Sequence, residues 1–128
     1  MRIFSMIEND MKFTIGDLKY CFKERKTDFT HLIKVYEIIR AEAEKSPIVI
    51  KNSGMIETGL NFSKLSEKSG FGQNLLAKRL KELRDLEVVY YYDIHRKGVQ
   101  LRIYFNSNNE NCQYLNKMLE KAKNENLL

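Results

Sequence analysis

The sequence predicts an α+β domain in which amphipathic helices lead into a two-stranded hairpin. In segment 73–86, Leu76, Leu80 and Leu83 fall on one line of a 3.6-residue helix, so this helix must bury one face. From residue 88 to residue 105 the apolar period changes to two, which is typical of paired strands. A chain of 128 residues with 43% hydrophobic content can bury one core, so we expect a single domain.

The N-terminal third of the chain is expected to be mainly helical. Residues 3–7 have the pattern of a strand, and a helix is expected from about 17 to 26. Thr30 can cap the next helix, 31–45, which Pro47 stops. Two isoleucines lie off the apolar face of that helix, so we expect a second neighbour, either the N-terminal segment or another subunit: Ile33 and Ile38.

Residues 47–60 form an insertion before the next helix. Its apolar segments 48–50 and 55–57 flank a turn at 52–54, so they predict a small hairpin. The sequence gives this hairpin no role.

Two helices joined by a tight turn follow the insertion. Asn61 or Ser63 can cap the first of them, and Gly70 ends it by supplying the left-handed residue of the turn. The second helix is 73–86. Opposite its leucine stripe, helical geometry collects amides, a small residue and long cations, which suit the major groove of DNA: Gln73, Asn74, Ala77, Lys78, Lys81 and Arg84. The alternative is an ordinary amphipathic helix with solvated lysines.

The tyrosine-rich segment after this helix predicts a hairpin with a basic tip. One continuous apolar face forms if the pairs are Ile94–Val99, Tyr92–Leu101, Tyr90–Ile103 and Val88–Phe105. This alternation buries two of the three tyrosines 90–92, which favours a core role over a stacking platform for single-stranded nucleic acid. The tip projects from that core and is either an ordinary polar turn or a contact to DNA: His95, Arg96, Lys97 and Gly98.

Several residues of this region occur together in a known family. They are Phe62-Ser63-Lys64-Leu65, Gly70-Phe71-Gly72, Leu76, Leu80, Glu82, Leu83 and Val88-Val89, followed by the hairpin. With them, about a third of the chain resembles the winged helix-turn-helix transcriptional regulators of the HxlR and MarR type. Two features differ from that family, because the chain has no tryptophan and Glu87 stands where a glycine often precedes the wing strand.

The resemblance implies a winged helix-turn-helix domain with a C-terminal two-stranded wing and flanking helices. Its core would span about 30–106, with an N-terminal extension, 1–29, and a C-terminal helix, 107–128. It also implies a sequence-specific, double-stranded DNA-binding regulator, with helix 73–86 in the major groove and wing 95–98 on the adjacent backbone or minor groove. Two other functions stay open: a protein–protein interaction module of the same fold, and a plasmid or viral protein that binds a replication origin.

A homodimer is also expected. The segment 110–125 predicts a helix whose narrow apolar stripe either packs on its own domain or pairs with a second copy: Leu115, Met118, Leu119 and Ala122. A regulator that reads two half-sites needs a two-fold interface, which favours the second copy.

Composition limits the remaining functional classes. The net charge of +5, from 22 basic and 17 acidic residues, modestly favours a polyanionic partner. Cys21 and Cys112 are far apart and are expected to be reduced and partly buried, without a disulfide or a metal. Neither His31 nor His95 has a recognisable catalytic partner, so we expect no enzyme activity and no cofactor. No apolar run has membrane-spanning length, and we expect a cytoplasmic protein.

Overall fold

The computed structural model describes residues 11–46, 49–50, 54–92 and 102–128 and has an α+β architecture. The predicted strand at 3–7 and the predicted wing tip lie outside these residues. In chain order the described elements are α2 (Ile15–Glu24), α3 (Lys26–Lys45), β1 (Val49–Ile50), β2 (Met55–Glu57), α4 (Phe62–Ser69), α5 (Gln73–Asp85), β3 (Val89–Tyr92), β4 (Arg102–Asn106) and α6 (Asn111–Asn124).

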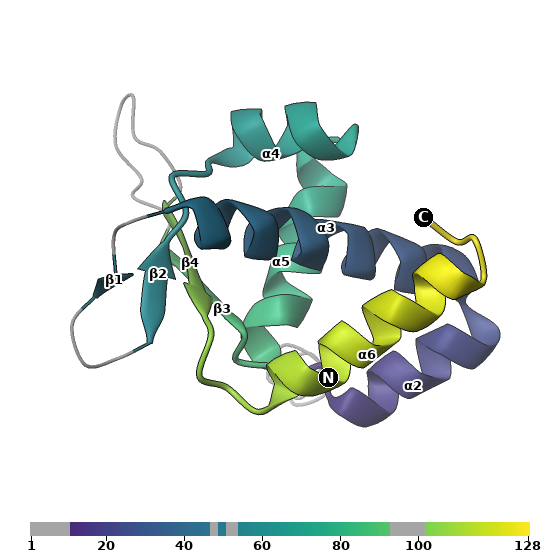
Figure 1. Ribbon diagram of the computed structural model, residues 1–128. Helices are drawn as coiled ribbons and strands as arrows, with labels where there is room; N and C mark the ends of the chain where they lie inside the picture. Colours follow the sequence, from purple (N-terminus) through teal and green to yellow (C-terminus); the bar gives the residue numbers. More distant parts are fainter. Residues whose placement is uncertain (1–10, 47–48, 51–53, 93–101) are drawn as a thin grey trace, which may run out of the picture.

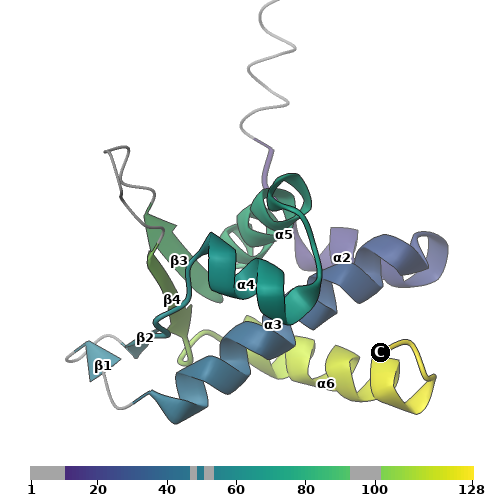
Figure 2. The ribbon, with the colours of Figure 1, turned by 90° about the horizontal axis from the view of Figure 1, so that it is seen from above.

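Helix α3 lies at the centre of the helical layer. It packs against α2, α4, α5 and α6, and the small sheet closes one end of the molecule (Figure 1). Figure 2 shows α4 and α5 on one side of α3 and α6 on the other. Ile33 is fully buried and Ile38 packs against the same core, so the second neighbour of this helix belongs to the same chain.

The start of α3 differs from the prediction. The helix begins at Lys26, so Thr30 lies inside it and caps nothing. Tertiary packing favours the added turn, because Phe29 is fully buried and its ring meets Phe22 edge-on at 4.9 Å. The capping box belongs instead to α2, where the Thr14 hydroxyl accepts from the Asp17 amide and the Asp17 carboxylate accepts from the Thr14 amide.

The two helices before the wing form where local signals predict them. The Asn61 side chain accepts a hydrogen bond from the Lys64 amide at 2.9 Å and so caps α4. Gly70 ends α4 in the left-handed conformation, with φ of 78°, and its amide donates to the Ser66 carbonyl. Helix α5 then begins at Gln73, as predicted.

The described strands form one antiparallel sheet in the order β1-β2-β4-β3. The predicted hairpin in the insertion is confirmed, with Val49 opposite Ile56. Its second strand also pairs with the wing, because Ile56 lies opposite Phe105 on β4. The insertion therefore widens the sheet that carries the wing strands. The order α3, β2, α4, α5, β3, β4 is compatible with a winged-helix-like class.

The predicted register of the wing strands was wrong by one residue. Val89 lies opposite Phe105, and Tyr91 lies opposite Ile103. The shift arises at Glu87, whose φ of 64° turns the chain so that Val88 is held by α5 through a hydrogen bond from its amide to the Leu83 carbonyl. Glu87 thus adopts the left-handed conformation that glycine adopts most readily, at the position where the resembling family often has glycine.

A shift of one residue exchanges the two faces of a strand. Val89 and Tyr91 therefore face the helices, whereas Tyr90 and Tyr92 are each 43% exposed. The expectation that two of the three consecutive tyrosines enter the core is wrong. On the outer face, the rings of Tyr90 and Tyr92 meet edge-on at 5.3 Å and cover the buried Tyr104.

The C-terminal helix packs on its own domain. Its apolar stripe, from Leu115 to Ala122, is at most 5% exposed at each of the four predicted positions. The contact with α3 includes a polar group, because the Asn116 side-chain oxygen accepts from the Tyr36 hydroxyl at 2.7 Å and from Arg40 at 2.8 Å. The stripe is therefore already covered and is not free to pair with a second copy. This stripe therefore cannot form the interface of the expected homodimer, which stays a prediction.

Candidate nucleic-acid interface

Helix α5 separates its side chains into a buried face and an exposed face. Leu76, Leu80 and Leu83 are fully buried against the domain, as their spacing predicted. The opposite face is open, and all six residues predicted to contact DNA from this helix are exposed on it: Gln73, Asn74, Ala77, Lys78, Lys81 and Arg84. The structure therefore brings together one continuous surface of amides, a small residue and cations.

Arg79 holds α5 in this orientation. Its side chain is only 2% exposed, and its guanidinium donates to the Asp28 backbone carbonyl at 3.1 Å. The Asp28 carboxylate lies 3.6 Å away, and Glu82 lies 3.1 Å from the Arg79 Nε. Burial raises the pKa of Glu82, although the positive charge of Arg79 opposes the shift. This buried ion cluster joins α5 to the first turn of α3 and so fixes which side chains point outward.

Sequence reasoning missed Arg79, although a signal for it existed. Arg79 follows Leu76 by three residues and precedes Leu83 by four, so helical geometry places it within the leucine stripe. A cation at such a position is buried only if an acid accompanies it. Glu82, three residues later on the same helix, could be recognised from the sequence as one acidic partner. The second partner, Asp28, could not, because it comes from a distant part of the sequence.

The cations of the exposed face are not equivalent. Lys81 donates to the Asp85 carboxylate at 2.8 Å, whereas no acidic side chain of the described residues pairs with Lys78. Burial favours the neutral form of Asp85, but hydrogen bonds from Lys81 and from the Phe13 amide outweigh it and lower the pKa of this carboxyl. Asp85 therefore neutralises part of the charge of Lys81. Lys78 forms no such ion pair with a described residue, although its charge acts on Glu82 one turn further along α5.

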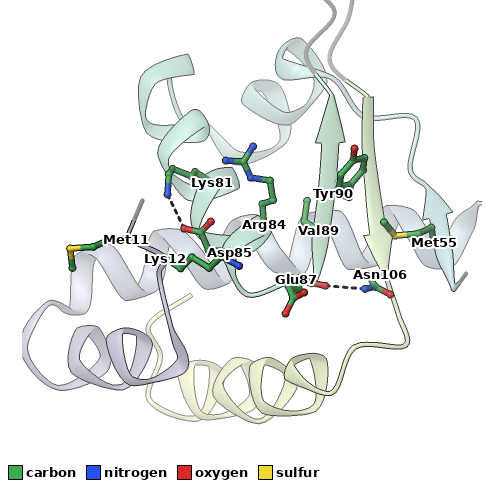
Figure 3. A pocket seen from close by; sticks show the side chains of 10 residues that line it. All are labelled: Met11, Lys12, Met55, Lys81, Arg84, Asp85, Glu87, Val89, Tyr90 and Asn106. Atoms are coloured by element: carbon green, nitrogen blue, oxygen red, sulfur yellow. Dashed lines mark hydrogen bonds and ion pairs between the residues drawn. The ribbon is translucent and has the colours of Figure 1, made fainter. Parts of the chain in front are cut away.

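A hollow of about 520 Å³ lies beside the C-terminal half of α5, at the base of the wing strands (Figure 3). Lys81 and Arg84 line it from α5, and Tyr90 lines it from β3. Lys12 joins them because the Phe13 amide donates to Asp85 at 3.0 Å and fixes this part of the chain on α5. Among the described residues three cations and the two acids Asp85 and Glu87 border the hollow, so Lys12 adds one positive charge to a mixed surface. The spacing of residues in the sequence did not predict that Lys12 would lie beside α5.

Arg84 also links the helix to the wing strands. Its guanidinium carbon lies 5.0 Å from the centre of the Tyr91 ring, a distance typical of a cation–π contact. The three predicted wing-tip contacts, His95, Arg96 and Lys97, lie outside the described residues. Their position relative to α5 is therefore still an expectation.

The described part of the chain gives little support for a metal site or a reactive cysteine. There, no group of three or more His, Cys, Asp or Glu side chains is placed to hold a metal ion. Cys21 and Cys112 are both free, and burial raises the pKa of each thiol, which lowers its reactivity. No helix in the described ranges is sufficiently long and apolar to cross a membrane.

No family model, curated protein or solved structure matches this chain.

Proposed function

We propose that this protein is a sequence-specific, double-stranded DNA-binding protein of the winged helix-turn-helix type that acts as a transcriptional regulator. The main support is the exposed face of α5, which carries Gln73, Asn74, Ala77 and Lys78 together while the opposite face is fixed by leucines and by Arg79. The proposed role requires access to cellular DNA, in keeping with the cytoplasmic location expected from the sequence.

Each exposed residue type has a distinct use in a major groove. An α-helix fits a groove about 12 Å wide, and its N-terminal residues reach the base edges. Gln73 and Asn74 occupy the first turn of α5, where a side-chain amide can bind adenine with two hydrogen bonds. Ala77 allows the helix to approach closely. Lys78, one position further, forms no ion pair with a described acid and would reach guanine or phosphate.

The surroundings of α5 suit contacts to the DNA backbone. Lys12 and Arg84 border the hollow at the C-terminal end of the helix and would lie over a flanking phosphate. The wing-tip residues His95, Arg96 and Lys97 would contact the backbone or the minor groove on the other side. Phosphate contacts position the protein, and the amides then select the sequence.

The deciding experiment selects a preferred duplex from a random pool and compares variants on that duplex and on random DNA. Asn74→Ala is expected to lose about 1–3 kcal/mol on the preferred duplex and little on random DNA, since a base contact is lost while phosphate contacts remain. Asn124→Ala changes an exposed asparagine at the end of α6 and is the matched control. Equal losses of affinity on both duplexes would mean that Asn74 only positions the protein on the DNA backbone. Failure to enrich any duplex would reject the proposal.

One alternative function has support of its own. A protein–protein interaction module is favoured by the pairing of Lys81 with Asp85 and by the exposed rings of Tyr90 and Tyr92 on the outer face of the sheet. The salt dependence of binding distinguishes the two functions. A DNA-binding surface loses affinity steeply as salt rises, by about 0.9 log units per log unit of salt for each phosphate contact.

We propose a homodimer for the DNA-bound state, because one recognition helix reads only a few base pairs and two-fold pairing doubles the site. The interface must use a surface other than the buried stripe of α6. Selected duplexes are then expected to contain two half-sites separated by about 10 base pairs or a multiple of that. Light scattering that gives a monomer at micromolar concentration, both free and on DNA, would reject the dimer.

A further inference from the structure

The outer face of the sheet exposes a cluster of aromatic rings. Strand residues that lie opposite each other share a face of the sheet, and Tyr90 lies opposite Tyr104 on the face away from the helices (Figure 1). Tyr92 lies opposite Arg102, and Glu57 lies opposite Tyr104 from the other side. Five residues from three strands therefore form this surface, which we call the tyrosine face: Glu57, Tyr90, Tyr92, Arg102 and Tyr104.

The rings of the tyrosine face pack against one another but remain accessible. Tyr90 and Tyr92 are each 43% exposed and meet edge-on, with ring centres 5.3 Å apart. Tyr92 also meets the ring of Tyr104 edge-on at 5.6 Å. Tyrosine side chains that are already ordered lose little conformational entropy on binding, and they combine an apolar ring with a hydroxyl group. These properties suit a protein partner.

The ion pair of this face favours a protein over a nucleic acid. The Arg102 guanidinium lies 3.4 Å from the Glu57 carboxylate, and the two side chains are 57% and 27% exposed. Among the five residues of the tyrosine face, the one cation is thus neutralised by the one acid. A single-stranded nucleic acid would need unpaired cations along its backbone as well as rings for its bases. The exposed pair instead offers a protein partner one group of each sign.

A second copy of the chain fits these properties. The net charge of +5 makes two copies repel each other over much of their surfaces, and a neutral face reduces that repulsion. In a two-fold contact the same patch meets itself. A patch with one acid and one cation is then self-complementary, because each copy supplies a partner for the other's charges. None of the residues proposed to read bases belongs to the tyrosine face, so this contact leaves the first turn of α5 free.

We propose that two copies of the chain pair through the tyrosine face, with Tyr90 and Tyr92 at the centre and Arg102 of each copy beside Glu57 of the other. This pairing rests on the proposed function, since a regulator that reads two half-sites needs a two-fold interface and the stripe of α6 is covered. The contact itself involves no DNA.

The exposed area sets the strength of this contact. Stable interfaces bury about 800 Å² per partner, which is far more than two partly exposed rings supply. Pairing is therefore weak in the free protein. It is stronger on a duplex with two half-sites, because that duplex holds both copies close together and raises their effective concentration.

Analytical ultracentrifugation without DNA tests the pairing. The native protein is expected to sediment increasingly as a dimer from about 10 µM to about 1 mM, as mass action requires of a weak complex. Replacement of both exposed rings, Tyr90→Ser with Tyr92→Ser, is expected to weaken the dimer about tenfold or more, because central aromatic residues carry much of the energy of an interface. Tyr20→Ser removes a tyrosine that is 57% exposed on α2 and is the matched control.

An exchange of charges separates pairing from a merely structural role of Arg102. Glu57→Arg and Arg102→Glu each place like charges opposite each other, so each variant alone is expected to stay monomeric. In an equimolar mixture one copy carries two acids on this face and the other carries two cations, so the dimer is expected to return. Within each variant the ion pair stays broken. A defect of the fold alone could not be repaired by mixing.

Three outcomes would overturn this interface. The first is a native protein that stays monomeric throughout the concentration range. The second is a dimer that the paired tyrosine replacements weaken no more than Tyr20→Ser does. The third is a mixture of the charge variants that dimerises no better than either variant alone. The proposed function fails by a different result, the absence of any selected duplex. If a duplex is selected while the native protein stays monomeric, DNA binding stands and the pairing fails.

Discussion

The substitution Asp85→Asn tests whether the C-terminal half of α5 touches DNA. Asparagine keeps the shape of the side chain and one oxygen acceptor but removes the negative charge. Asp85 now accepts hydrogen bonds from Lys81 at 2.8 Å and from the Phe13 amide at 3.0 Å. The change therefore releases Lys81 and weakens the bond that fixes Lys12 beside the helix.

Two terms set the loss of stability. The contact to Lys81, whose side chain is 46% exposed, contributes about 0.3–0.5 kcal/mol. A hydrogen bond from the Phe13 amide to a neutral acceptor is weaker than one to a carboxylate by about 1 kcal/mol. Asp85→Asn is therefore expected to lower the free energy of unfolding by roughly 1–1.5 kcal/mol near neutral pH, measured by urea denaturation.

The pH dependence has a definite sign. The pKa of Asp85 is lowered in the folded protein, so its stabilisation is present above the ordinary aspartate value and is lost as pH falls through the folded value. The difference between the native protein and Asp85→Asn is expected to disappear in acid. A difference that grows in acid would show that the carboxylate does not stabilise the fold.

DNA binding is expected to change in the opposite direction. A released Lys81 that contacts one phosphate steepens the salt slope by up to about 0.9 and raises affinity up to about eightfold at 0.1 M salt. Fluorescence anisotropy at several salt concentrations measures both quantities. Glu120→Gln gives the same change in net charge from an exposed position on α6 and is the control. The same gain in Glu120→Gln, or an unchanged slope in both Asp85→Asn and Lys81→Gln, would refute a contact of Lys81 with phosphate.

Three further substitutions or deletions test the fold and the wing. Arg79→Met is expected to cost about 3 kcal/mol in urea denaturation because Glu82 remains buried without its partner, and adding Glu82→Gln should recover part of the loss; simple additivity would contradict the buried pair. Lys97→Ala is expected to weaken binding to every duplex and to flatten the salt slope by up to about one unit, and an unchanged slope in both it and Arg96→Ala would remove the wing from the mechanism. Deletion of 111–128 is expected to abolish cooperative unfolding in circular dichroism, because α6 supplies core residues, whereas a cooperatively folded fragment would show that α6 is only an appendage.

Local chemistry made part of the fold predictable from the sequence. Asn61 and Gly70 mark the ends of α4 through bonds made within a few residues, so their roles could be seen without a structure. The exposed face of α5 was predictable for the same reason, because helical geometry alone separates Asn74 and Lys78 from the leucine stripe. These interactions need no knowledge of distant segments.

The errors arose where distant segments compete with local patterns. The wing register seemed self-consistent because tyrosines alternate in either register, and the choice depended on Glu87 adopting a left-handed conformation and on Val88 bonding to Leu83. The early start of α3 similarly depended on the burial of Phe29. The local sequence of α6 is equally compatible with packing of its stripe on its own domain and with packing on a second copy. Only the tertiary structure shows that α3 covers the stripe.

The two ends of α5 are held to different degrees, and this difference bears on how the protein would select its DNA sequence. The second half of the helix is fixed by Arg79 on α3, by the bond from Val88 to Leu83, and by the contact of Arg84 with Tyr91. Its first turn continues directly from the short turn that contains Phe71. A substitution that shifts this turn would therefore move the amides proposed to read bases, while the cations proposed to contact phosphate stay in place. Such a substitution is expected to change sequence preference more than affinity for random DNA.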